Sequence, residues 1–145
     1  MLEFGRRIDE KIYRPRPAAY AVIVDSVRQV ALIRTRKGFF LPGGGIEPGE
    51  TAEQALVREI QEECGRRGRI LAKIGEAVQY IDSGEDQYIA IHGVFFRAVL
   101  GDETGPPAEP DHELIWVLAS EASNRLRRES DVWAVTKVVS EMAGG

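Results

Sequence analysis

The sequence of 145 residues lacks most features that mark secreted or membrane-spanning proteins. It holds a single cysteine, Cys64, which excludes an internal disulfide and any metal site made of cysteines alone. No apolar run approaches the roughly 20 residues that a membrane span requires. Residues 1–13 mix both charge signs around no long apolar core, so a cleaved secretory signal is not expected. We therefore expect a cytoplasmic protein with no membrane partner.

An excess of positive charge is also absent. The chain has 19 Lys and Arg residues against 23 Asp and Glu residues, a formal net charge of −4. Without a general positive field it would attract phosphate backbones poorly, so duplex nucleic acid is not an expected partner. An anionic ligand would then need a local positive charge at its binding site, and a bound metal ion is the simplest source of one. The length and the ordinary composition, 43% hydrophobic and 29% charged, predict one soluble domain over residues 1–145.

Hydrophobic patterns predict an α/β chain. Two runs rich in β-branched and aromatic residues, 18–25 and 29–35, flank a polar turn and predict a hairpin. The other expected elements are a brief strand at 39–41, a second hairpin of strands 69–82 and 86–101, a strand at 113–118 and a helical tail at 119–142 with a break near Ser130. This order predicts a mixed β-sheet packed by helices.

The centre of the chain, LPGGGIEPGE at 41–50, is too rich in glycine and proline to continue a helix or a strand. A helix is expected directly after it. Thr51 is placed as the N-cap, Gln54 completes a capping box, and Gly65 is placed to end the helix. The loop therefore leads at a fixed offset into a helix of about four turns.

This predicted helix has two faces at about 100° per residue. The apolar face holds Leu56, Val57, Ile60 and Cys64. Beside it, Glu59, Glu62 and Glu63 form an acidic arc, although like charges at these spacings repel one another. A solvated acidic face paired with nearby arginines is one interpretation. The other is a site for a hard divalent cation, because clustered carboxylate oxygens are what Mg²⁺ or Mn²⁺ binds.

The spacing between loop and helix favours the cation site. From Gly44 to Arg66 the sequence resembles the Nudix box, Gx5Ex7REUxEExGU, in which U is aliphatic. Only the last position differs, being Arg66. The matching residues are Gly44, Glu50, Arg58, Glu59, Ile60, Glu62, Glu63 and Gly65. The protein therefore resembles a short, single-domain, MutT-like member of the Nudix hydrolase family, with its box at 44–66.

The resemblance implies an α/β/α sandwich with a mixed β-sheet. It also implies a metal-dependent pyrophosphohydrolase, which cleaves a nucleoside diphosphate linked to another group, such as a nucleoside triphosphate, by water attack at phosphorus. Mg²⁺ or Mn²⁺ would be the cofactor. Glu59, Glu62 and Glu63 would be metal ligands, and the carbonyl of Gly43 a further one.

Catalytic roles follow from the same resemblance. Glu50 would support the metal ligands, and Arg58 would orient the box carboxylates through charge-assisted hydrogen bonds, which suit its planar fork. Glu59 is the first choice for the general base. A later loop offers four alternatives for a further ligand or base, namely Glu109, Asp111, His112 and Glu113.

The substrate stays open. Arg34 and Arg36 are candidates for a phosphate contact and Tyr80 for stacking on a base, while a solvated strand end and a core aromatic are the alternatives. Many ADP-ribose hydrolases of the family carry a proline downstream of the box, and the corresponding residues 81–84 hold none. The RPRP stretch at 14–17 is interpreted as a loop lead-in or a subunit contact, which leaves a homodimer open.

Two other functions also stay open. One is a house-cleaning hydrolase for oxidised nucleoside triphosphates. The other is a non-catalytic nucleotide-sensing module on the same fold, since a fold alone does not imply an activity. Such a module would be expected to lose box carboxylates, and this chain keeps them.

Overall fold

The computed structural model describes residues 1–144, and Gly145, the last residue of the predicted domain, lies outside them. Its elements are, in chain order, β1 (Leu2–Phe4), β2 (Arg14–Val22), β3 (Gln29–Thr35), β4 (Gly38–Phe40), β5 (Gly43–Gly45), α1 (Ala52–Cys64), β6 (Arg66–Asp82), β7 (Tyr88–Glu103), β8 (Glu113–Leu118), α2 (Ala119–Arg125) and α3 (Glu129–Gly144). Among the described residues, no helix has the length and apolar character needed to cross a membrane.

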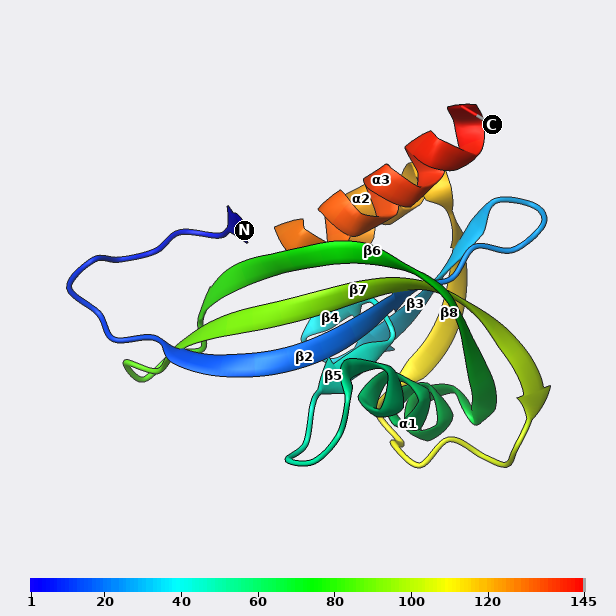
Figure 1. Cartoon of the computed structure of the whole chain (residues 1–145), viewed down its shortest axis with the longest axis horizontal. Coiled ribbons are helices and arrows are strands. Elements are labelled where there is room, and N and C mark those ends of the chain that lie inside the picture. The colour runs from blue at the N-terminus through cyan, green and yellow to red at the C-terminus, as the bar shows by residue number, and fades with distance from the viewer. Residues whose placement is uncertain (145) are drawn as a thin grey trace.

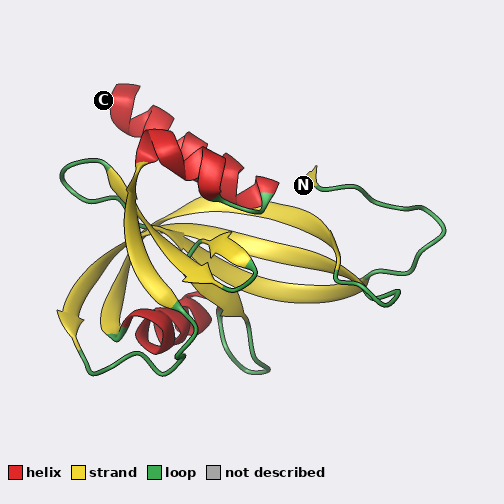
Figure 2. Cartoon of the chain, turned by 180° about the vertical axis from the view of Figure 1, so that it is seen from behind, coloured by secondary structure: helices red, strands yellow, loops and turns green. Residues whose placement is uncertain are grey.

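The strands form two sheets. The larger has the order β1-β6-β7-β2-β5 and is mixed, because β1 runs parallel to β6 and β2 parallel to β7 while the other pairs are antiparallel. The smaller, β4-β3-β8, is antiparallel. Helix α1 lies on one side of the strands and α2 with α3 on the other, as Figure 1 and the reverse view in Figure 2 show. The predicted α/β/α sandwich with a mixed β-sheet is confirmed.

Two apolar cores lie on the two sides of β2 and β3. Successive side chains of a strand point to opposite faces, so Tyr20 packs in the cluster that contains Val135 of α3, while Ala21 packs in the cluster that contains Ile60 of α1. Because both faces are covered, these strands read as nearly continuous apolar runs in the sequence.

The first predicted hairpin is confirmed near its turn, where Ala31 donates its N–H to the carbonyl of Ile23 at 3.0 Å, and is wrong farther out. The chain reverses where Asp25 donates its N–H to the carbonyl of Gln29 at 2.9 Å. After this turn the strands separate into different sheets, because β2 is flanked by β7 and β5 whereas β3 is flanked by β4 and β8. The second predicted hairpin is confirmed as the antiparallel pair β6 and β7. The predicted break in the helical tail falls at 126–128, just before Ser130.

The prediction that the RPRP stretch is a loop lead-in is also wrong, because residues 14–17 form the first part of β2. They pair in parallel with residues 89–92 of β7. The carbonyl of Pro17 accepts from Ile46, on the edge of β2 that faces away from β7. In a strand the N–H and the C=O of one residue point to the same edge. The N–H groups that Pro15 and Pro17 lack would therefore point away from β7, so their absence removes no hydrogen bond to β7.

Helix α1 begins and ends as the sequence predicts. The Thr51 hydroxyl accepts from the Gln54 N–H at 3.1 Å, and the Gln54 side chain accepts from the Thr51 N–H at 2.9 Å, which completes the capping box. At the other end Gly65 has φ of 64°, the left-handed conformation that glycine adopts without strain. These caps fix where the acidic arc begins relative to the glycine loop.

Candidate active site

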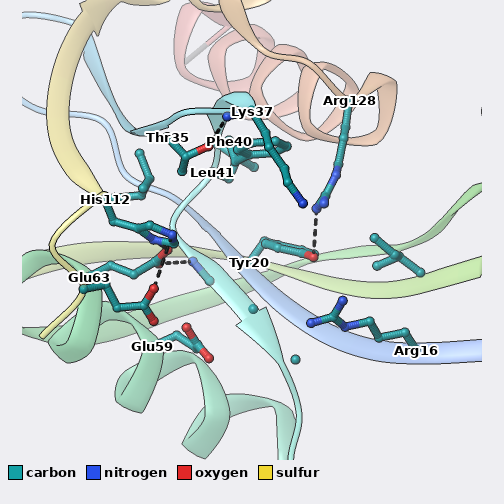
Figure 3. A pocket seen from close by; sticks show the side chains of 16 residues that line it. Arg16, Tyr20, Thr35, Lys37, Phe40, Leu41, Glu59, Glu63, His112 and Arg128 are labelled. Atoms are coloured by element: carbon teal, nitrogen blue, oxygen red, sulfur yellow. Dashed lines mark hydrogen bonds and ion pairs between the residues drawn. The ribbon is translucent and has the colours of Figure 1, made fainter. Parts of the chain in front are cut away.

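The three box carboxylates of α1 differ in burial. The side chain of Glu63 is 5% exposed, that of Glu59 is 15% exposed and that of Glu62 is 38% exposed. Glu59 and Glu63 line a pocket of about 390 Å³, whose wall also includes the three glycines of β5 (Figure 3). Two acids of the arc and the glycine strand therefore border the same cavity.

Arg58 joins the loop to the helix. Its Nε and Nη2 donate to the two carboxylate oxygens of Glu50 at 2.7 and 2.9 Å, a bidentate pair. Its Nη1 donates to Glu59 at 2.9 Å and its Nη2 to the carbonyl of Gly45 at 3.0 Å. The hydrogen bonds from the Arg58 guanidinium, and a weaker contribution from the Glu47 N–H, lower the pKa of Glu50 to about 2. Glu50 therefore stays ionised and holds Arg58 against Glu59.

Glu63 is held by two contacts at the base of the pocket. One carboxylate oxygen accepts from the Gly43 N–H at 2.8 Å, and the other lies 3.1 Å from Nδ1 of His112. Burial, followed by the charges of Glu59, Glu109 and Glu62, raises its pKa to about 8. Burial also raises the pKa of Glu59. Without a cation, this cluster therefore resists full ionisation.

The loop before β8 brings Glu109 and His112 to the box. Its backbone is fastened to the end of α1, since Ala108 donates its N–H to the carbonyl of Glu62 at 2.8 Å. Glu109 then offers an oxygen to a group with Glu59 and Glu62 whose atoms lie within 4.8 Å of one another. Nε2 of His112 lies 3.2 Å from the Glu109 carboxylate. The ring of His112 thus bridges Glu109 and Glu63.

The structure separates the alternatives on this loop. Glu109 joins the box carboxylates. Asp111 can form a group with Glu109 and His112 but faces Arg36 at 3.8 Å. Glu113 is on β8 and pairs with Arg34 of β3 at an exposed position. Glu109 is therefore the member of the set with the geometry of a further ligand or base.

The donor set suits a hard divalent cation. It consists of carboxylate oxygens of Glu59, Glu62 and Glu109, gathered at a spacing that one ion can bridge. Burial raises the pKa of Glu59 in this set and of Glu63 beside it. Gly43 lies beside this set, and only glycine fits there, because its φ is 138° and an added Cβ would lie 2.1 Å from the carbonyl of Ala19. The ligand role of its carbonyl stays a prediction.

The predicted substrate contacts receive no support from their positions. The Arg34 guanidinium pairs with Glu113, and Arg36 faces Asp111. The Tyr80 hydroxyl contacts Glu3, and its ring packs edge-on against another tyrosine at 5.1 Å. Among the described residues, the lining of the pocket beside Glu59 includes none of these three side chains.

The sequence interpretation missed three cations that do line the pocket. They are Arg16 of β2, Lys37 of the turn between β3 and β4, and Arg128 of the segment between α2 and α3. The Tyr20 hydroxyl accepts from Arg128 at 3.1 Å in the same cavity (Figure 3). These residues come from segments far apart in sequence, and no local motif links them. Only strand pairing and helix packing bring them together.

Comparison with known proteins agrees with the box and the fold. The model of the NUDIX domain family matches residues 14–137. A Mycobacterium tuberculosis protein, provisionally named mutator protein MutT4, is 34% identical over 123 residues, which cover 84% of this chain and 48% of that protein. The chain thus spans about half the length of this relative. An ADP-ribose pyrophosphatase of Methanocaldococcus jannaschii is 38% identical over 116 residues and covers 69% of this chain and 68% of its own length.

A solved structure agrees at the level of the fold. A NUDIX hydrolase from Nitrosomonas europaea superposes with a TM-score of 0.75 at 17% sequence identity, covering 88% of this chain and 90% of its own. The family match spans most of the chain, and it includes both the glycine loop and the carboxylate helix that form the pocket. The chain belongs to the Nudix hydrolase family.

Proposed function

We propose that this protein is a metal-dependent pyrophosphohydrolase. Its substrate would be a nucleoside diphosphate linked to another group, and the reaction would be attack of water at phosphorus. The observation that carries the proposal is the convergence of four carboxylates: Glu59, Glu63 and Glu109 line one pocket, and Glu62 lies within reach of the same ion as Glu59 and Glu109. Arg58 donates to Glu59 and holds it in place. A protein that only sensed nucleotides would have no need of four carboxylates whose mutual repulsion costs stability.

Glu59, Glu62 and Glu109 are the residues that would hold Mg²⁺ or Mn²⁺, with Glu63 and the Gly43 carbonyl next to them. The ion would neutralise phosphate oxygens and lower the pKa of water. The protein would do the rest by position. Arg58 and Glu50 keep the Glu59 carboxylate aimed at the cavity, and His112 spans Glu63 and Glu109.

The chemical step balances with water as the only co-substrate. The water oxygen bonds to phosphorus, the bridging P–O bond of the anhydride breaks, and its electron pair stays on the departing phosphate oxygen. The proton released by the water passes to the Glu59 carboxylate, our choice for the general base. The position of Glu59 suits this role, because Arg58 holds its carboxylate at the wall of the pocket, within reach of a bound water.

The test is hydrolysis of a substrate panel with Mg²⁺, with Mn²⁺ and with EDTA. The panel includes nucleoside triphosphates, the oxidised guanine triphosphate, ADP-ribose and dinucleoside polyphosphates. We expect metal-dependent turnover of at least one compound and a loss of about 100-fold or more in Glu59→Gln and Glu63→Gln. Glu53→Gln, an exposed position in the first turn of the same helix, is the matched control. No turnover of any compound, or variants that match the wild type, would contradict the proposal.

The same panel decides the house-cleaning alternative. The mutator name of the M. tuberculosis relative favours testing it. A preference for the oxidised over the normal guanine triphosphate would support that role, and equal kcat/KM values would remove it. ADP-ribose belongs in the panel because of the M. jannaschii relative, although residues 81–84 lack the expected proline.

A further inference from the structure

The pocket has two chemically different sides. Figure 3 shows Glu59, Glu63 and His112 on one side and Lys37 and Arg128 on the other, with the Tyr20 ring between them. Arg16 extends from β2 into the same cavity and passes over Gly45, where an added Cβ would lie 3.7 Å from its Nε. We call Arg16, Lys37 and Arg128 the cationic subsite. The carboxylate cluster does not account for these three charges.

No carboxylate of the described residues forms an ion pair with the cationic subsite. Among residues 1–144, no carboxylate lies within 4 Å of the charged nitrogens of these three side chains. Other arginines of the chain do find partners, as Arg34 and Arg58 show. Burial raises the pKa of Asp131 and the nearby charge of Arg128 lowers it, but this carboxylate accepts from the Leu41 N–H at 3.3 Å and forms no ion pair with the guanidinium. Cations gathered in a cleft attract an anion strongly, because the low-dielectric walls focus their field.

Two of the three cations come from segments that are tied to each other. Arg127 donates its Nη1 to the carbonyl of Lys37 at 2.6 Å and its backbone N–H to the carbonyl of Phe39 at 3.1 Å. The turn that carries Lys37 is therefore fixed against the segment that carries Arg128. This arrangement brings two positive side chains into one cavity at a cost in repulsion that a bound anion would remove.

Arg128 is positioned before any ligand arrives. Its guanidinium lies 4.7 Å from the centroid of the Phe40 ring and donates to the Tyr20 hydroxyl. A guanidinium has five N–H donors, so these contacts leave others for a planar anion such as a phosphate or a carboxylate. A preorganised cation loses little freedom when it binds, which favours affinity.

We propose that the cationic subsite binds a second anionic group, carried by the organic part of the substrate. This inference rests on the proposed function, since it places the scissile diphosphate on the carboxylate side of the same pocket. The substrate class is then a diphosphate whose organic moiety bears a phosphate or a carboxylate of its own. A pocket of about 390 Å³ has room for both ends of such a molecule.

Matched substrate pairs test this directly. Coenzyme A and dephospho-coenzyme A differ only in a 3′-phosphate, and UDP-glucuronate and UDP-glucose differ only in a carboxylate. We expect kcat/KM to be about 10- to 100-fold higher for the more anionic member of at least one pair, chiefly through KM. The pair that shows the preference identifies the second anion. Equal kcat/KM within both pairs, in an enzyme that hydrolyses them, would overturn the inference while leaving the proposed function intact.

Variants assign the preference to the cationic subsite. Lys37→Gln and Arg128→Gln should lower kcat/KM for the more anionic member by about tenfold or more and leave the other member near the wild-type value. Arg69→Gln removes the same charge from an exposed position of β6 outside the pocket and should change neither. Lys37 is exposed and only its backbone carbonyl is bonded to Arg127, so its replacement does not threaten folding. A preference that survives in both variants would overturn the assignment.

A binding measurement works even if turnover fails. Calorimetry in EDTA compares adenosine 5′-monophosphate with adenosine 3′,5′-bisphosphate as probes of the metal-free pocket. We expect the bisphosphate to bind about tenfold more tightly to the wild type and to lose that advantage in Lys37→Gln. Equal affinity of the two probes for the wild type would count against the cationic subsite, whatever the outcome of the activity panel.

Discussion

Replacing Glu63 by glutamine should stabilise the metal-free protein while removing its hydrolytic activity. The Glu63 carboxyl is buried at the base of the pocket, and its pKa is raised to about 8. Glutamine keeps the shape and both contacts, because its oxygen can accept from the Gly43 N–H and its amide nitrogen can donate to Nδ1 of His112. The substitution therefore removes the charge and little else.

The sign of the effect follows from proton binding. The folded chain keeps the Glu63 proton up to about pH 8, whereas the unfolded chain releases it near pH 4.5, so the free energy of unfolding falls as the pH rises between these values. At about 1.4 kcal/mol per pKa unit, this loss is about 3 kcal/mol at pH 7 and about 5 kcal/mol above pH 8. Neutral glutamine has no such loss, so the variant should exceed the wild type by growing amounts.

Urea unfolding in EDTA at pH 5, 7 and 8.5, followed by tryptophan fluorescence, measures this difference. The exposed loop variant Glu10→Gln is the control and should follow the wild type at each pH. Addition of Mg²⁺ should stabilise the wild type more than Glu63→Gln, because the ion binds only the folded site and needs the carboxylate. If wild type and Glu63→Gln show the same dependence on pH in EDTA, burial does not penalise this charge and the reasoning is refuted.

Three further perturbations test the surroundings of the site. Arg58→Lys keeps the charge but loses the bidentate pair with Glu50, so kcat/KM should fall by about 10-fold or more at an unchanged urea midpoint in Mg²⁺; full activity would show that the fork geometry is unimportant. Thr51→Ala removes the hydroxyl half of the capping box and should lower the free energy of unfolding by about 1 kcal/mol, measured with urea, whereas no change would mean that water replaces the cap. Asp131 is fully buried with a pKa raised to about 6 by burial, so the unfolding free energy of Asp131→Asn relative to the wild type should rise by about 2 kcal/mol between pH 4 and pH 8; a constant difference would contradict this.

The burial of the box carboxylates was largely set by helix geometry. On the wheel, Glu63 is the carboxylate nearest the apolar stripe, Glu59 is next and Glu62 is farthest from it. Their side-chain exposures of 5%, 15% and 38% follow the same order. The charge with the most perturbed pKa is thus placed by the same periodicity that places the core. A cation that binds here relieves an electrostatic cost that the helix itself creates.

The sequence alone determined the parts that depend on local interactions. The capping box at Thr51, the left-handed Gly65 and the acidic arc of α1 all follow from residues a few positions apart, because helix caps and helix faces are set within one or two turns. The box spacing then led to the family, and the family to the sandwich fold. The loop beside Glu109 could be named as a candidate region, but which of its acids joins the site could not.

Tertiary structure decided what depends on long-range pairing. The strands around the first turn look like one hairpin locally, yet β2 and β3 belong to different sheets, because their edges are taken by β7, β5, β4 and β8 from elsewhere in the chain. Glu109 and His112 reach Glu63 only because their loop is bonded to the end of α1. Arg16, Lys37 and Arg128 meet in one pocket although no spacing relates them. Local chemistry thus fixed the helical carboxylates of this pocket, and packing between distant segments supplied Glu109, His112 and the cationic subsite.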